Sequence, residues 1–244
     1  MVRRCLAYAA VVICSPLPLQ PAHAEPRAVI ELFTSQGCSS CPPADQLLGE
    51  LTNDPSLVAV SVPVDYWDYL GWKDTLADPH NTARQKAYAH ARGDGQVYTP
   101  QVVVNGSLLA LGSDKAAIEV AIAASRKKGA MSLLPALTVG DGRLNITVPE
   151  LVDGHVGGEV WLVGVMKAAT IAIARGENKG RTITYHNVAR RWIKLGDWTG
   201  KAISWSIPAQ TLKAANVDEA AVVVQSGTTE KPKAILGATL AGIR

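Results

Sequence analysis

Two cysteines, Cys38 and Cys41, stand two residues apart in the stretch SQGCSSCPPADQ. A pair at this spacing can exchange with another disulfide, bind a metal, or form a permanent cross-link. A disulfide that closes so short a loop removes little entropy from the unfolded chain, which disfavours a purely stabilising bond. A structural zinc needs four ligands, and no histidine stands at ligand spacing near the pair. Redox chemistry is therefore favoured without metal or cofactor, while the cross-link and the metal site remain as alternatives.

The segments on either side of the cysteines indicate how a thiol there could be activated. AVIELFT before them is typical of a strand, and PADQLLGELT after them has apolar residues at helical spacing. A helix N-terminus offers partial positive charge and free N–H groups, which favour a thiolate over a thiol. We therefore expect Cys38 to be the exposed, attacking sulfur and Cys41 to be the resolving sulfur.

The order of elements in residues 25–128 predicts an α/β thioredoxin-like domain. LVAVSVPV is a buried parallel strand, a helix follows from about His80 to Arg92, and Asn105-Gly106 marks a hairpin. A CxxC pair beside such βαβ elements is typical of thioredoxin-like redox proteins. In this fold Pro100 is expected to be cis, although only about 5% of X–Pro bonds are. Thr99 and Pro100 are then expected to bind the backbone of a substrate.

An aromatic run, VDYWDYLGWKD, follows the second strand and should leave it on the same rim as Cys38. Tyr66, Trp67 and Trp72 are predicted to form a wall that faces the substrate, and the alternative is that they anchor the loop. Asp68 is a candidate for handling protons.

Glu31 alternates with Val29 and Phe33 on the first strand and is expected to point inward. There it could take the proton of Cys41 during the resolving step. A hydrogen-bonded structural carboxylate is the alternative interpretation.

After a linker at residues 129–133, the chain becomes rich in short strands and turns. This pattern predicts an all-β, sandwich-like domain over residues 134–244. We interpret the basic stretch RGENKGRTITYHNVARRW as a solvated face around a hairpin. No catalytic pattern is present here, so this domain could bind a partner, orient a substrate or mediate dimerisation.

Residues 1–24 resemble a signal peptide, with Arg3 and Arg4, a short apolar run and the ending Ala22-His23-Ala24. The apolar run is shorter than the ~20 residues that span a bilayer. Cleavage would leave Cys38 and Cys41 as the only cysteines and a formal charge of +1 instead of +3. We expect an exported protein, periplasmic or secreted, in an oxidising compartment. Without a basic stripe or a later apolar span, neither nucleic acid nor a membrane span is predicted.

Five segments carry a resemblance to a known family: VIELFTSQGCSSCPPADQLLGEL, VDYWDYLGWKD, TARQKAYA, VYTPQVVVNG and RGENKGRTITYHNVARRW. Together they resemble secreted bacterial proteins catalogued as domain of unknown function 1223. The resemblance implies a thioredoxin-like N-terminal domain and a β-rich C-terminal domain, and it implies no established reaction.

Two functions follow as hypotheses. In the first, a thiol–disulfide oxidoreductase-like protein uses Cys38 as nucleophile and Cys41 as resolving cysteine, and its partner is a protein or small-molecule thiol or disulfide. In the second, a non-catalytic binding module carries a permanent disulfide. Metal handling by the two thiolates is a weaker alternative. The sequence determines neither the direction of exchange nor the oligomeric state.

Overall fold

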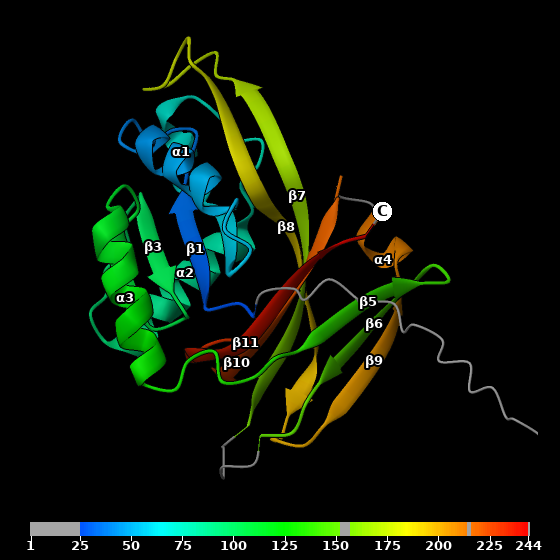
Figure 1. The fold of residues 1–244 in the computed structure, drawn as a ribbon. Helices are drawn as coiled ribbons and strands as arrows, with labels where there is room; N and C mark the ends of the chain where they lie inside the picture. The colour runs from blue at the N-terminus through cyan, green and yellow to red at the C-terminus, as the bar shows by residue number, and fades with distance from the viewer. Residues whose placement is uncertain (1–24, 152–156, 214–215, 244) are drawn as a thin grey trace, which may run out of the picture.

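The computed structural model describes residues 25–151, 157–213 and 216–243. The predicted signal peptide, residues 1–24, lies outside the described residues. Eight strands form one mixed sheet in the order β11-β10-β7-β8-β2-β1-β3-β4, and β5, β6 and β9 form a second sheet (Figure 1). Within the described ranges, no helix is both long enough and apolar enough to cross a bilayer.

The N-terminal half surrounds one end of the large sheet with helices. Strand β1 pairs in parallel with β2 and antiparallel with β3, and β3 and β4 form the predicted hairpin. Alternate residues of β1 face opposite ways, so Ile30 and Leu32 pack with α1 and α3, while Val29 and Phe33 pack on the other side with Tyr88 of α2. The elements are β1 (Ala28–Thr34), α1 (Pro42–Leu51), β2 (Leu57–Pro63), η1 (Asp68–Leu70), α2 (Pro79–Arg92), β3 (Gln101–Val104), β4 (Leu108–Leu111) and α3 (Lys115–Lys127).

Local sequence explains where α2 begins and ends. The side chain of Asp78 accepts a hydrogen bond from the N–H of His80, and Pro79 occupies the first turn, where its missing N–H is not needed. Gly93 ends the helix with φ of +77°, a conformation that glycine adopts without strain. The predicted helix from about His80 to Arg92 is confirmed.

The C-terminal half is β-rich. A long antiparallel hairpin, β7 with β8, pairs from Gly158 and Trp198 to Ala172 and Thr182. The second sheet packs against the lower part of this hairpin through Leu144 and Ile146 of β6. The elements are β5 (Ala136–Gly140), β6 (Arg143–Val148), β7 (Gly158–Ala172), β8 (Thr182–Trp198), β9 (Ile203–Pro208), α4 (Gln210–Lys213), β10 (Glu219–Gly227) and β11 (Pro232–Gly242).

The sheet and its core continue across the predicted linker. Strand β8 pairs in parallel with β2 at Val188 and Ser61, which joins the two halves into one sheet. One apolar cluster contains Val60 from the first half and Val163 and Val223 from the second. The upper part of the hairpin lies beside α1 (Figure 1), so close that a Cβ on Gly49 would come within 2.7 Å of the His186 ring. The long hairpin therefore reaches from the β-rich part to the cysteine-bearing helix.

Candidate functional site

Cys38 and Cys41 form a disulfide in the turn between β1 and α1, with their Cα atoms 5.4 Å apart. Cys41 is the N-cap of α1, and its N–H donates to the carbonyl of Cys38 at 3.2 Å. Pro42 and Pro43 occupy the first positions of the helix, and proline has no N–H. The N–H of Ala44 already donates to the carbonyl of Cys41. The first turn therefore offers none of the free N–H groups that we expected to activate a thiolate, and only the helix dipole is left for this role.

Cys38 is buried, with 1% of its surface exposed, although we expected an exposed attacking sulfur. The hairpin tip, the turn of residues 173–181 that joins β7 to β8, is one of the segments that contact the loop around Cys38. The side-chain amide of Asn178 donates to the carbonyls of Gln36 and Cys38, at 2.9 and 2.8 Å. A carboxylate oxygen of Glu177 accepts a hydrogen bond from the N–H of Ser39 at 3.2 Å. Residues about 140 positions later in the sequence thus lie against the cysteine loop.

The aromatic segment, residues 64–74, also packs against this loop. The indole of Trp67 donates to the hydroxyl of Thr99 at 2.8 Å, and the indole of Trp72 donates to the side chain of Gln36 at 2.8 Å. A Cβ on Gly37 would come within 2.9 Å of the Cβ of Trp67, so this glycine allows a close approach. Tyr66 packs against the core, and burial raises its pKa to about 12. Of the three predicted wall residues, Trp67 and Trp72 therefore contact the cysteine loop, whereas Tyr66 packs against the core.

The Thr99–Pro100 bond is cis, as predicted. Pro100 is buried, and its carbonyl accepts a hydrogen bond from the N–H of Gly112. Thr99 is half-buried, and its backbone N–H and C=O make no hydrogen bond to any described residue. An extended backbone could pair with these two groups in the manner of an added strand.

Asp45 is a buried carboxyl group one helical turn after Cys41, with 3% of its surface exposed. The hydroxyl of Thr34 donates to one of its oxygens at 2.7 Å, and within the described part of the chain the other oxygen accepts no hydrogen bond. Burial, with a smaller contribution from Asp74, raises the pKa of Asp45 to about 7. Our sequence reasoning overlooked this residue, although an aspartate between the buried Ala44 and Leu48 of an amphipathic helix was a visible signal.

Two further buried groups lie near Asp45. Asp74 accepts hydrogen bonds from the backbone N–H groups of Gln36, Leu76 and Ala77, yet burial still raises its pKa. Tyr185 of β8 is fully buried, and burial together with Asp45 and Asp74 raises its pKa well above the ordinary value.

Asp68, the predicted proton-handling candidate, accepts a hydrogen bond from the N–H of Asp74. This bond lies within the aromatic segment and stabilises its conformation.

Comparison with known proteins gives a family for the chain. The model of a family described as "Protein of unknown function (DUF1223)" matches residues 29–225. The chain belongs to the DUF1223 family.

Solved structures similar to the DUF1223 protein come from two bacteria. The crystal structure of target AtR35 from Agrobacterium tumefaciens is 30% identical, covers 91% of this chain and 97% of its own, and has a TM-score of 0.81. HBP35 of Porphyromonas gingivalis is 12% identical, covers 90% of this chain and 76% of its own, and has a TM-score of 0.60, which shows a shared fold alone. No curated protein matches.

Glu31 of the DUF1223 protein lies in a different network from the cysteines. Its carboxylate pairs with the guanidinium of Arg84 at 2.6 Å and accepts a hydrogen bond from the hydroxyl of Tyr88 at 2.6 Å. Arg84 also donates to the side chain of Gln225 at 3.0 Å. Glu31 therefore connects β1 with α2 and β10, which favours the alternative interpretation of a structural carboxylate.

Among the described residues of the DUF1223 protein, no group of three or more His, Cys, Asp or Glu side chains could hold a metal ion.

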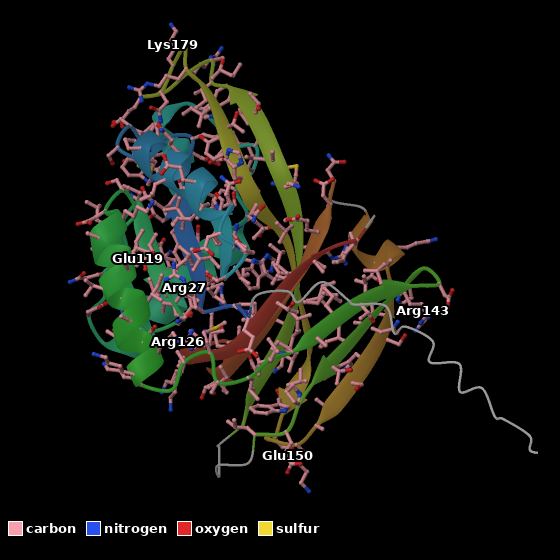
Figure 2. All side chains as sticks on the ribbon, in the orientation of Figure 1. Arg27, Glu119, Arg126, Arg143, Glu150 and Lys179 are labelled. Atoms are coloured by element: carbon pink, nitrogen blue, oxygen red, sulfur yellow. A yellow bond between two sulfur atoms is a disulfide. The ribbon has the colours of Figure 1, made fainter. Side chains whose placement is uncertain are left out.

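The basic stretch that we interpreted as a solvated face contains both exposed and buried residues. Figure 2 shows Lys179 at the outer end of the hairpin tip, while the neighbouring Asn178 is buried against the cysteine loop. The residues that sequence reasoning missed are therefore Asp45, Asn178 and Glu177.

Proposed function

We propose that this DUF1223 protein is an exported, periplasmic or secreted, thiol–disulfide oxidoreductase-like protein. In this proposal the N-terminal half is thioredoxin-like, and the β-rich part, residues 134–244, is sandwich-like. The observation that carries the proposal is the disulfide at the start of α1, in the turn that follows the parallel strand β1. Trp67 connects this turn to Thr99, because its indole donates to the Thr99 hydroxyl and its Cβ lies close to Gly37. The partner is a protein or small-molecule thiol or disulfide, and no cofactor is needed.

The reaction is a pair of thiol–disulfide exchanges. A partner thiolate attacks the sulfur of Cys38, a mixed disulfide forms, the Cys38–Cys41 bond breaks, and the electron pair passes to the sulfur of Cys41. A protonated Asp45, one turn away, can give its proton to this thiolate. A second partner thiolate then attacks the partner sulfur of the mixed disulfide and releases Cys38 as a thiolate. In the opposite direction, Cys38 attacks a partner disulfide and Asp45 takes the proton of Cys41 before it resolves the intermediate.

The reduction potential of the pair tests this proposal. The protein without residues 1–24 is equilibrated in glutathione buffers, and alkylated thiols are counted by mass. A potential between about −120 and −270 mV is the range of working redox proteins, and we expect a value there. A disulfide that stays closed below about −300 mV would be a structural bond and would refute the proposal.

A cavity favours a second candidate function, the binding of a small molecule. It has a volume of about 360 Å³ and lies where α2, β7 and β8 meet. The rings of Trp161 and Trp192 meet edge to face across 6.4 Å, and the guanidinium of Arg84 lies 4.3 Å from the centre of the Trp192 ring. Glu31 balances the charge of Arg84, and the other charged residue of the lining, Glu230, is exposed to solvent. The walls therefore favour a flat, neutral aromatic molecule over an ion.

The neutral fluorophore N-phenyl-1-naphthylamine tests the cavity. We expect saturable binding with one site per chain, which is lost in Ala83→Trp because the indole fills the space. Lys86→Trp is the matched control, because Lys86 is exposed on the same helix and does not line the cavity. Equal binding by both variants would show adsorption elsewhere and would remove this candidate.

A further inference from the structure

The hairpin tip closes over the cysteine loop, and this contact bears on which partners can react. We infer that the tip selects small or flexible thiols and disulfides, and that it excludes folded protein partners until it is displaced. The inference rests on the proposed function, because it concerns access to the same disulfide.

The contact is specific and buried. Asn178 is 1% exposed, and each hydrogen of its amide group donates to a backbone carbonyl of the cysteine loop, one at Gln36 and one at Cys38. These carbonyls lie on both sides of Gly37, so the tip fixes the backbone that precedes the attacking sulfur. With Cys38 only 1% exposed, a thiolate cannot approach its sulfur unless a side chain or the tip moves.

The same contact is built to open reversibly. The amide oxygen of Asn178 is buried and accepts no hydrogen bond from the residues that the structure describes, and an unpaired buried acceptor costs free energy in the closed arrangement. On opening, water can bond to this oxygen and to both freed carbonyls. A further hydrogen bond between tip and loop, from the N–H of Ser39 to Glu177, is exposed, so water competes with it and its net contribution is small.

The tip is a compact unit rather than a loose loop. Its N–H groups at Gly180 and Arg181 donate to the carbonyls of Ile173 and Asn178, at 2.8 and 3.1 Å. Below it, the ladder of β7 and β8 continues to Ala172 and Thr182. A Cβ on Gly176 would come within 3.3 Å of the Cβ of Trp72, so the tip also touches the aromatic segment.

This construction separates partners by size. We expect a small thiol to need only a local movement of the loop or of a neighbouring side chain before it reaches the sulfur of Cys38. We expect a folded protein that presents a thiol to need displacement of the tip, which breaks both hydrogen bonds of Asn178. The chemistry is the same exchange in both cases, with one sulfur–sulfur bond formed and one broken.

Rates of disulfide reduction test the inference. Second-order rate constants are measured for dithiothreitol and for reduced thioredoxin, a folded protein dithiol, with wild type, Asn178→Ala and the matched control Lys179→Ala. Asn178→Ala removes both donors, whereas Lys179 is the exposed neighbour on the same turn. We expect the ratio of the protein rate to the dithiothreitol rate to rise about tenfold in Asn178→Ala and to stay at the wild-type value in Lys179→Ala.

The measured rates separate a failure of this inference from a failure of the proposed function. If the disulfide reacts in every variant with an unchanged ratio, the tip does not select partners, and the proposed function is unaffected. If no variant reacts with either reagent, the proposed function fails, and this inference fails with it. Should Asn178→Ala not fold, Glu177→Ala tests the same contact from an exposed position, and a smaller rise of the ratio is expected.

Discussion

Asp45 is the residue whose ionisation should have the clearest effect on this protein. It is buried, and its pKa is about 7 instead of the ordinary value of 3.8. Because the pKa of Asp45 is raised in the folded state, its contribution to the free energy of unfolding is fully present below pH 4 and is lost as the pH rises through 7. Asp45→Asn removes the cost of burying an ionised carboxylate at high pH, because the amide does not ionise.

We expect Asp45→Asn to be more stable than wild type at pH 8.5, by up to about 4 kcal/mol, with the difference shrinking towards pH 5. Urea unfolding at the two pH values measures it. Asp141→Asn is the matched control, because Asp141 lies exposed in a turn. The same difference at both pH values would show that Asp45 does not titrate in this range.

The same substitution should also slow the resolving step. The mixed disulfide of Cys38 with 5-thio-2-nitrobenzoate releases the coloured thiolate when Cys41 attacks, and Asp45 can take the proton of Cys41. We expect Asp45→Asn to slow this release by about a hundredfold near pH 7 and to remove its titration near that pH. If the release from Asp45→Asn kept the pH profile of wild type, a group other than Asp45 would take the proton of Cys41.

Residue patterns predicted part of this site. The cysteine pair and the cis-proline follow from local order, and both are present. Asn178 could not be predicted in its place, because its contact with Cys38 spans 140 residues and depends on how the hairpin docks. The burial of Cys38 was also missed, because exposure depends on how segments distant in the sequence pack around the loop.

At the scale of elements, a buried network joins α2 to β1 and β10 through Glu31, Arg84 and Gln225. The Glu31 side chain is 1% exposed and that of Arg84 is 13% exposed. Removing one partner of such a pair leaves the other charge without compensation, whereas replacing both with uncharged side chains costs less.

We expect Glu31→Gln to lower the free energy of unfolding by about 3 kcal/mol, and the double variant with Arg84→Met to lose less than the sum of the single changes. Urea unfolding of the four proteins forms the cycle. Glu31→Gln should leave the pH dependence of disulfide exchange unchanged, since Glu31 is bonded to Arg84 and Tyr88 instead of the cysteines. A changed pH dependence with unchanged stability would restore the proton-handling role.

The hairpin illustrates what element patterns predict and what they leave out. Alternation and turn residues predicted several short strands after Leu134, but β7 and β8 are single strands of 15 and 17 residues. Register shifts at Val160 and at Gly164 let these strands bend, and such irregularities break the alternation on which prediction depends. The glycine-rich turn was recognisable, whereas its position over α1 was not.

At the scale of the molecule, the eight-stranded sheet and one apolar cluster contain residues from both of the halves that differ in sequence pattern. Residues 25–128 and 134–244 differ in pattern, so the sequence predicts two domains joined by a linker. In the structure, however, the linker pairs with β11 through Met131 and Leu133, whose N–H groups donate to the carbonyls of Ile235 and Leu236. Local patterns carry no information on which edge of a sheet a later strand will join, so the continuity of the sheet was not predictable.

A shared core has a thermodynamic consequence. Val60 and Val62 of β2 pack in the same cluster as Val163 of β7 and Val223 of β10, so neither half can unfold without exposing the apolar surface of the other. We therefore expect one cooperative unfolding transition, with the same midpoint by near-ultraviolet circular dichroism and by exchange of backbone amides in β1 and in β10. The fragment of residues 25–133, which lacks β7, β8, β10 and β11, should unfold at a much lower urea concentration than residues 25–244. Two separate transitions, or a fragment as stable as the whole chain, would show independent domains and would mean that the contact of the hairpin tip with the cysteine loop is a contact between separate units.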